Sequence, residues 1–257
     1  MADDRQPVIF ELCIASEFDA LCGAVKGVDR VELNSALELG GLTPSIGMTE
    51  RVVQKLGVQD IPVIAMVRPR PGGFAYDSDH LVVMRRDIDW LLEVGAHGVA
   101  FGILERDGTI DVHKCAELIK PVVEAGREAV FHRAFDFVPD PTTGLEKLVD
   151  LGVHRVMTSG GKPSAIEGSA VIRSLIEQAG SRIEVLPAGG IRPQNVAELV
   201  RETYAKQVHA ALRDDKPDRS LSSNPAIELN SAPIPRDRFM AADSTAVEAM
   251  VKALKVF

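Results

Sequence analysis

The sequence predicts one (β/α)8 barrel, an α/β fold of the TIM-barrel type, over residues 1–257. Short β-branched or apolar runs alternate with longer amphipathic runs along nearly the whole chain. Glycines follow the amphipathic runs, as they do where helices end. Three junctions also resemble one another: GVDRVEL, GAHGVAF and GVHRVMT. A doubly wound open sheet is the rival fold, but the glycine-rich first turn that it usually carries is absent after VIFELCI.

The expected strands are eight short segments of buried character. They fall at 8–14, 29–34, 62–67, 97–103, 128–134, 154–159, 182–188 and 206–211. Between them, apolar residues recur three and four apart, for example in 78–95, 111–126 and 164–180, which predicts helices. No linker interrupts this pattern, so we expect a single domain.

A long segment near the end of the chain departs from the pattern. Residues 211–241 are rich in Pro, Ser and Asp and lack periodicity, and a last helix is expected at 242–255. As the final strand-to-helix connection, this loop belongs at the carboxyl-end mouth of the barrel. Loops of this length are uncommon in compact domains, and both a lid and a surface insertion fit the sequence.

Composition narrows the class of protein. The net charge is -8, from 37 acidic against 29 basic residues, which argues against a broad nucleic-acid surface. The sequence has no apolar stretch of the ~20 residues that cross a bilayer, and the start MADDRQP does not resemble a signal peptide. Three widely spaced Cys do not form a disulfide framework. We therefore expect a cytoplasmic protein without a nucleic-acid or membrane partner.

Side-chain alternation indicates which residues face into the barrel. With Phe10 and Leu12 packing on helices, Glu11 and Cys13 point inward. The same reasoning places further polar residues inside or at the rim, where barrel enzymes gather their functional groups. These are Arg30, Glu32 and Asn34 on the second strand, Arg68 after the third, His132, Arg133 and Asp136 after the fifth, Ser159 after the sixth, and His209 on the eighth.

Two interpretations of these charged residues stay open. Arg30 and Arg155 favour a buried salt-bridge network that fixes the register of the strands. A mixture of acid, base and cation at one rim instead suggests acid–base chemistry on a small anionic molecule. In that hypothesis Glu11 or Glu32 is the general base, His132 the acid and Arg68 the clamp for a carboxylate or phosphate. Asp136 completes the candidate catalytic set, and Asn34, Arg133, Ser159 and His209 the candidate ligand-binding set.

Paired glycines end two neighbouring strands. TSGGK covers 158–162 and PAGGI covers 187–191, with Gly189 and Gly190 just before the next helix. Such glycines let backbone N–H groups and a helix N-terminus approach an anion, an arrangement that many barrels use for phosphate. Glycine also serves tight turns, so these motifs make a phosphate or carboxylate ligand plausible without establishing one.

Six motifs together resemble one known family. FELCIAS, DRVELN, GGLTPS, MVRPRPGGF, FHRAFD and RVMTSG are similar, in order and spacing, to the CutC family of copper homeostasis proteins, over most of residues 8–210. The resemblance implies a TIM barrel, a cytoplasmic location, a role in copper tolerance or trafficking with copper(I) as the proposed ligand, and often an oligomeric assembly. The family's strand-one Cys falls on Cys13.

The chain departs from the family at a chemically important position. Asn34 stands where relatives often carry a second Cys, and copper(I) prefers thiolate and thioether ligands. Cys22 and Cys115 fall on helices and are not expected to reach Cys13. Copper binding at Cys13 with a His or Met from the mouth, zinc or manganese held by Glu11, Glu32, His132 and His209, and an enzyme without metal all stay open. A pure interaction scaffold ranks last.

Overall fold

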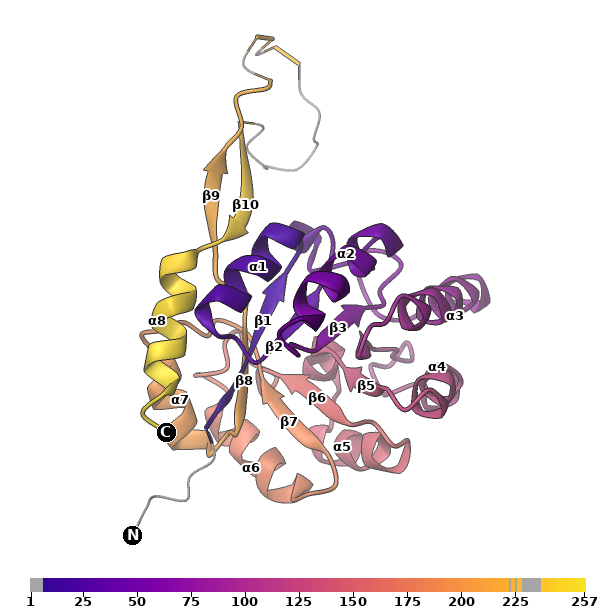
Figure 1. Ribbon diagram of the computed structural model, residues 1–257. Coiled ribbons are helices and arrows are strands. Elements are labelled where there is room, and N and C mark those ends of the chain that lie inside the picture. Colours follow the sequence, from indigo (N-terminus) through magenta and orange to yellow (C-terminus); the bar gives the residue numbers. More distant parts are fainter. Residues whose placement is uncertain (1–6, 222, 225, 228–236) are drawn as a thin grey trace.

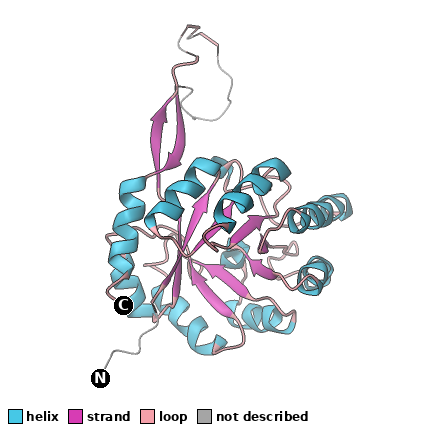
Figure 2. Cartoon of the chain, in the orientation of Figure 1, coloured by secondary structure: helices cyan, strands magenta, loops and turns pink. Residues whose placement is uncertain are grey.

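The computed structural model describes residues 7–221, 223–224, 226–227 and 237–257. Eight parallel strands alternate with helices that cover the outside of the ring (Figure 1; Figure 2). These strands are β1 (Ile9–Ile14), β2 (Arg30–Leu33), β3 (Val63–Met66), β4 (Gly98–Phe101), β5 (Glu128–Phe131), β6 (Arg155–Thr158), β7 (Glu184–Pro187) and β8 (Gln207–Ala210). The predicted (β/α)8 barrel is confirmed.

Each strand is followed by helical structure, most of it capped by a side chain. The α-helices are α1 (Glu17–Lys26), α2 (Ile46–Gly57), α3 (Ser78–Glu93), α4 (Val112–Glu124), α5 (Pro141–Asp150), α6 (Ser169–Ala179), α7 (Val196–Thr203) and α8 (Ser244–Leu254), with short 3-10 helices at Leu37–Leu39 and Arg133–Phe137. The six caps that accept backbone N–H bonds are Ser16, Ser45, Asp77, Asp111, Asp140 and Asp243. Within the described residues, no helix is long and apolar enough to cross a membrane.

The strands pair in sequence order, and β1 closes the ring against β8. The sheet runs β7-β6-β5-β4-β3-β2-β1-β8. Its two ends, β7 and β8, meet through a single isolated parallel bridge, Ala188 to His209. The observed strands are a few residues shorter than predicted, because the pairing stops before the residues that bend into the mouth.

Alternation along each strand divides the core into two layers. Phe10, Leu12 and Ile14 face the helices and are almost fully buried, as are Val31 and Leu33 on β2. Burial of each such side chain contributes roughly 1.5–3 kcal/mol, so this outer layer holds the helices on the ring. The interior of the ring has small apolar clusters, and polar residues fill the space between them.

The segment 211–241 is not free of regular structure, contrary to the prediction. Its ends form an antiparallel hairpin of β9 (Arg213–Pro217) and β10 (Arg238–Ala242). In Figure 1 this hairpin extends away from the ring of strands, next to α1 and α8. The strands were hard to recognise because β9 is mostly charged and only Ala241 and Ala242 of the two strands are buried. The lid hypothesis for 222, 225 and 228–236 lies outside the described residues.

Candidate functional site

Three neighbouring strands bring the main candidate residues together. β1 lies between β2 and β8, and the register pairs Cys13 with Glu32 and Glu11 with His209. Because each of these residues faces into the ring, their side chains meet inside the barrel near its carboxyl end. Glu11, Cys13, Glu32 and His209 are all buried, none more than 7% exposed.

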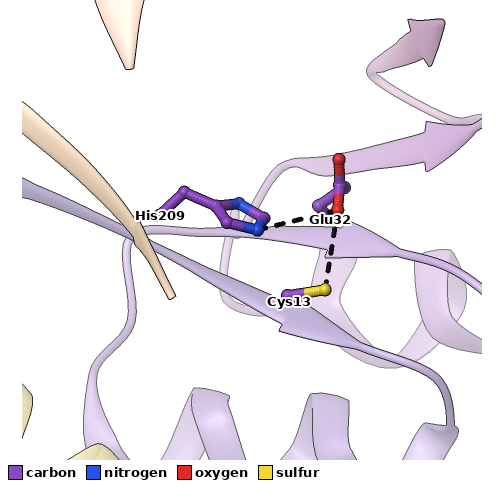
Figure 3. Close-up of side chains that lie close together, drawn as sticks. All are labelled: Cys13, Glu32 and His209. Atoms are coloured by element: carbon purple, nitrogen blue, oxygen red, sulfur yellow. Dashed lines mark hydrogen bonds and ion pairs between the residues drawn. The ribbon is translucent and has the colours of Figure 1, made fainter. Parts of the chain in front are cut away.

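Cys13, Glu32 and His209 form a compact group of metal-ligand types. One ligand atom from each lies within 4.8 Å of the others. Figure 3 shows the Cys13 thiol and the His209 imidazole directed at the Glu32 carboxylate. Cys13 Sγ is 3.6 Å from Glu32 Oε2, and His209 Nε2 is 3.8 Å from the same oxygen. Three donors of different elements therefore converge on one point.

Asn34, directly after β2, supports this group. Its Nδ2 donates to Glu32 Oε2 at 2.9 Å and lies 3.5 Å from Cys13 Sγ. An amide nitrogen has no free lone pair for a metal, so Asn34 orients the other two residues instead of joining them as a ligand.

Glu11 orients His209 from the opposite side. Glu11 Oε1 lies 2.8 Å from His209 Nδ1, and its other oxygen pairs with Arg30. A carboxylate partner keeps the proton on Nδ1, which leaves the Nε2 lone pair directed at Glu32. This carboxylate–histidine arrangement is typical of the outer shell of metal sites. Glu11 is therefore a positioning residue in this geometry.

Burial and neighbouring charges shift the pKa values of these four residues in different directions. Burial raises the pKa of Glu32, and the Glu11 charge adds to that effect. Burial alone would also raise the pKa of Glu11, but Arg30 and His209 outweigh it and hold that pKa well below its usual range. The pKa of the Cys13 thiol is raised by burial and by Glu32. Despite burial, the two carboxylates raise the pKa of His209. The group thus holds protons that a cation could displace.

The group opens into a small cavity that we name the mouth pocket. Its volume is about 130 Å³. It is lined by Cys13, Glu32, Asn34, Leu37, Gly40, Met66, Arg68, Phe74, His132, Arg133, Ala134, Met157 and His209. From the sequence, Met66 is expected to serve core packing, as single methionines in apolar runs usually do, and Met157 and Phe74 do not stand out. Inward alternation at the carboxyl ends of β3 and β6 was the available signal for the two methionines.

Arg68 lies in the wall of the pocket and is 6% exposed. Its Nη1 donates to the carbonyl oxygens of Leu39 and Gly41, and its Nη2 donates to that of Gly72. The guanidinium also lies 5.2 Å from the centre of the Phe74 ring. Because these contacts use several of its N–H groups, Arg68 has fewer left for two parallel hydrogen bonds to a carboxylate or phosphate than the sequence suggested.

His132 is a buried, neutral histidine beside Arg68. Its Nδ1 accepts the backbone N–H of Ala134 at 3.1 Å, so the ring proton is on Nε2. Burial and the Arg68 charge lower its pKa to about 3. At neutral pH the imidazole is therefore uncharged, and the general-acid role suggested for it would need a neutral N–H as the donor.

Asp136, Arg133 and Ser159 form a separate network at the β5 and β6 ends. Asp136 accepts from Arg133 Nε at 2.8 Å, Thr158 Oγ1 at 2.6 Å and the Ser159 backbone N–H at 2.7 Å. The Arg133 guanidinium packs on Gly189, where an added Cβ would lie 3.1 Å from it. Gly189 and Gly190 both have positive φ. The geometry brings these predicted residues together around Asp136, apart from the Cys13 group.

The interpretation that buried salt bridges fix the register of the strands fits Arg30 and Arg155, at the starts of β2 and β6. Arg30 pairs with Glu11 and donates to Gln207, while Arg155 pairs with Glu128 and Glu184. Cys115 is buried on α4 and Cys22 lies on α1, and the metal-type group of described residues includes neither.

The fold and the site define a TIM-barrel protein with a candidate metal-binding group in its mouth. The family model described as "CutC family" matches residues 8–213, and this chain belongs to that family. A CutC family protein from Treponema denticola is 40% identical over 245 residues, covering 95% of this chain and 97% of its own. The human copper homeostasis protein cutC homolog is 38% identical over 224 residues, covering 87% and 80%.

Solved structures agree with this assignment. The CutC protein of Streptococcus agalactiae superposes with a TM-score of 0.73 at 32% identity, covering 79% of this chain and 97% of that one. A structure described as native KDPGal, at a TM-score of 0.58 and 16% identity, shares the fold alone.

Proposed function

We propose that this chain serves copper homeostasis by binding a copper(I) ion in the mouth pocket. The observation that carries the proposal is the convergence of Cys13, Glu32 and His209 within 4.8 Å in a buried site. The human and Streptococcus agalactiae relatives are named as copper homeostasis proteins, which supports this role. The free cysteines suit a reducing compartment, so we place the protein in the cytoplasm. Assembly into a homo-oligomer stays a prediction.

The residues fit copper(I) better than the sequence alone suggested. A thiolate and an imidazole are good copper(I) ligands, and Met66 and Met157 add two thioethers to the lining of the same pocket. The sulfur that Asn34 does not supply can thus come from a methionine. Zinc is the competing ion, because it accepts Cys13, His209 and the Glu32 carboxylate as a mixed set. Manganese prefers oxygen ligands and fits the Cys13 thiol poorly.

A chelator competition tests the proposal. The protein is titrated anaerobically with copper(I) against a chromogenic chelator, and we expect one tightly bound ion per chain. Cys13→Ser should weaken copper(I) binding by more than about a hundredfold, beyond the loss that outer hydrogen-bonding partners cause. Cys22→Ser removes a thiol outside the site and serves as the control. An unchanged affinity in the Cys13→Ser variant would overturn the proposal.

Two further variants separate copper from zinc. Glu32→Gln removes a charged oxygen ligand and should weaken zinc binding while copper(I) binding is kept. A Met66→Leu, Met157→Leu double variant should weaken copper(I) binding and leave zinc binding unchanged. If Glu32→Gln weakens the binding of both metals and the double methionine variant weakens neither, the site is a zinc site.

One observation favours an enzyme as the second candidate. His209 Nε2 lies 3.8 Å from Glu32 Oε2, so the two groups can act on the same substrate atom, and both have raised pKa values, which suits acid–base catalysis. The acid–base pair would then be Glu32 and His209, acting on a small anionic substrate near Arg68. Turnover of such a substrate by metal-free protein, abolished in His209→Gln, would support this candidate.

A further inference from the structure

Arg68 is a buried cation without a carboxylate partner among the described residues. Its hydrogen bonds go to neutral carbonyl oxygens, which use both hydrogens of Nη1 and one of Nη2. One N–H of Nη2 and the N–H of Nε are left near the Tyr76 hydroxyl, which is uncharged, and Nε is buried without a hydrogen-bond partner. A buried charge without compensation is destabilising, so this guanidinium favours an anion beside it.

His132 adds a second unpaired donor to the lining of the same pocket. Its Nδ1 edge lies against Ala134 and Gly102, where a Cβ added to Gly102 would be 2.6 Å from Nδ1. Only a glycine leaves room for the ring in this position. The ring centre lies 5.0 Å from that of Phe74, which is also next to Arg68. His132 Nε2, which carries the proton, is buried and has no hydrogen-bond partner.

The rest of the pocket limits the size and character of a ligand. Phe74, Met66, Met157, Leu37 and Ala134 give it an apolar wall. A volume of about 130 Å³ is close to the roughly 150 Å³ of a cavity that accepts benzene, so a ligand has only a few heavy atoms. Arg68 supplies one positive charge, which matches a ligand with a single negative charge.

From this combination we propose that the mouth pocket binds a short-chain monocarboxylate. The carboxylate lies against Arg68 and the Nε2–H of His132, and the alkyl part lies against Phe74 and the methionines. This ligand satisfies the unpaired donors and neutralises the buried charge. The carboxylate is held by Arg68 and His132, which are not proposed copper ligands, and only the apolar contact is shared with Met66 and Met157. The inference therefore goes beyond the proposed function and does not depend on it.

Thermal unfolding of chelator-treated, metal-free protein tests this site. Propionate is the probe, propionamide is its uncharged equivalent, and sodium phosphate and sodium chloride are added at matched ionic strength. We expect propionate to raise the melting temperature in a saturable manner, because it binds the folded state only. Propionamide and chloride should not. A response to propionamide equal to that to propionate, or to phosphate alone, would overturn the monocarboxylate assignment.

Two substitutions at one position isolate the His132 donor. The Asn oxygen of His132→Asn can keep the bond from Ala134, but the variant lacks a donor at the Nε2 position. His132→Gln can place its amide N–H near that position. We expect propionate affinity to fall about tenfold in His132→Asn and to be largely kept in His132→Gln, a difference of about 1.4 kcal/mol. His113→Asn changes a histidine that is exposed on α4 and serves as the matched control. Equal affinities in all three variants would contradict the proposal.

Metal dependence separates this inference from the proposed function. Propionate should bind the metal-free protein, whether or not the chain also binds copper(I). If propionate binds only to copper-loaded protein, the anion is a metal ligand and the Arg68–His132 site is wrong. If propionate binds and copper(I) does not, the proposed function fails while this inference stands.

Discussion

The two sides of the barrel mouth contain similar residues but differ in how completely their polar atoms are paired. On the β5–β6 side, Asp136 accepts bonds from Arg133, Thr158, Ser159 and Gly161. In the mouth pocket, Glu32 Oε1 and Arg68 Nε are buried without partners, and so is Nε2 of His132, which follows β5 but lines this pocket. Polar groups whose hydrogen bonds are all made within the protein hold a loop in place, whereas buried polar groups without partners indicate a place for a ligand. The comparison shows that residue type alone does not separate these two roles.

Asp136→Ala should give the largest effect on stability. The substitution leaves several buried donors and the Arg133 guanidinium without their acceptor, and we expect a loss of about 3 kcal/mol in the free energy of unfolding. Urea denaturation measures the loss, with the exposed Asp89→Ala as the control. Copper(I) affinity should not change. A stable variant with impaired ligand binding would reverse our assignment of the two sides.

Glu11→Gln should produce the next largest change, this time in metal affinity. The neutral amide no longer fixes the proton on His209 Nδ1, and such outer partners typically contribute 10–100-fold, or about 1.4–2.8 kcal/mol. Chelator competition for copper(I) measures the effect. Glu184→Gln breaks an ion pair of Arg155 at the far end of the barrel and is the control. An unchanged affinity would argue against the positioning role of Glu11.

Acid should destabilise the fold through His132. Its pKa is lowered to about 3 in the folded protein, against roughly 6.5 in an unfolded chain. Its neutral form therefore contributes fully above pH 6.5, and the contribution is lost as the pH falls toward 3. At pH 5 this loss is about 2 kcal/mol.

The His132→Asn variant isolates this effect. Unfolding free energies of both proteins are measured at pH 7 and pH 5 in buffers free of carboxylate, and the unchanged protein should lose about 2 kcal/mol more than the variant. His113→Asn should follow the unchanged protein. A difference that is constant with pH would show that His132 is not kept neutral by the fold.

Glu32→Gln should have the smallest effect on stability. Burial raises the pKa of Glu32, and Gln is the neutral equivalent of the protonated acid. It can also accept the bond from Asn34, so we expect a change of less than about 1 kcal/mol in urea denaturation. A loss as large as that of Asp136→Ala would mean that Glu32 belongs to the structural side of the comparison.

The fold was largely predictable because each unit repeats the same local pattern. Alternation on β1 and β2 correctly placed Glu11, Cys13 and Glu32 inside the ring, since the period of a strand is two. The β9–β10 hairpin was missed because β9 consists mostly of charged residues and the two strands bury little.

The chemistry of the site was less predictable, because it depends on contacts between distant residues. Arg68 donates hydrogen bonds to the carbonyl oxygens of Leu39, Gly41 and Gly72. These bonds depend on loop conformations in which Gly41 and Gly72 have positive φ. The neutral state of His132 depends on the Ala134 N–H and on the space left by Gly102. No spacing of residue types in the sequence carries this information.

The single bridge that joins β7 to β8 places His209 where the ring closes. An ion coordinated by residues of β1, β2 and β8 would therefore stabilise the β7–β8 junction, where the ring of eight strands opens most easily. Amide hydrogen exchange along β7 and β8 should slow on loading, while exchange along β4 and β5, across the ring, should stay the same.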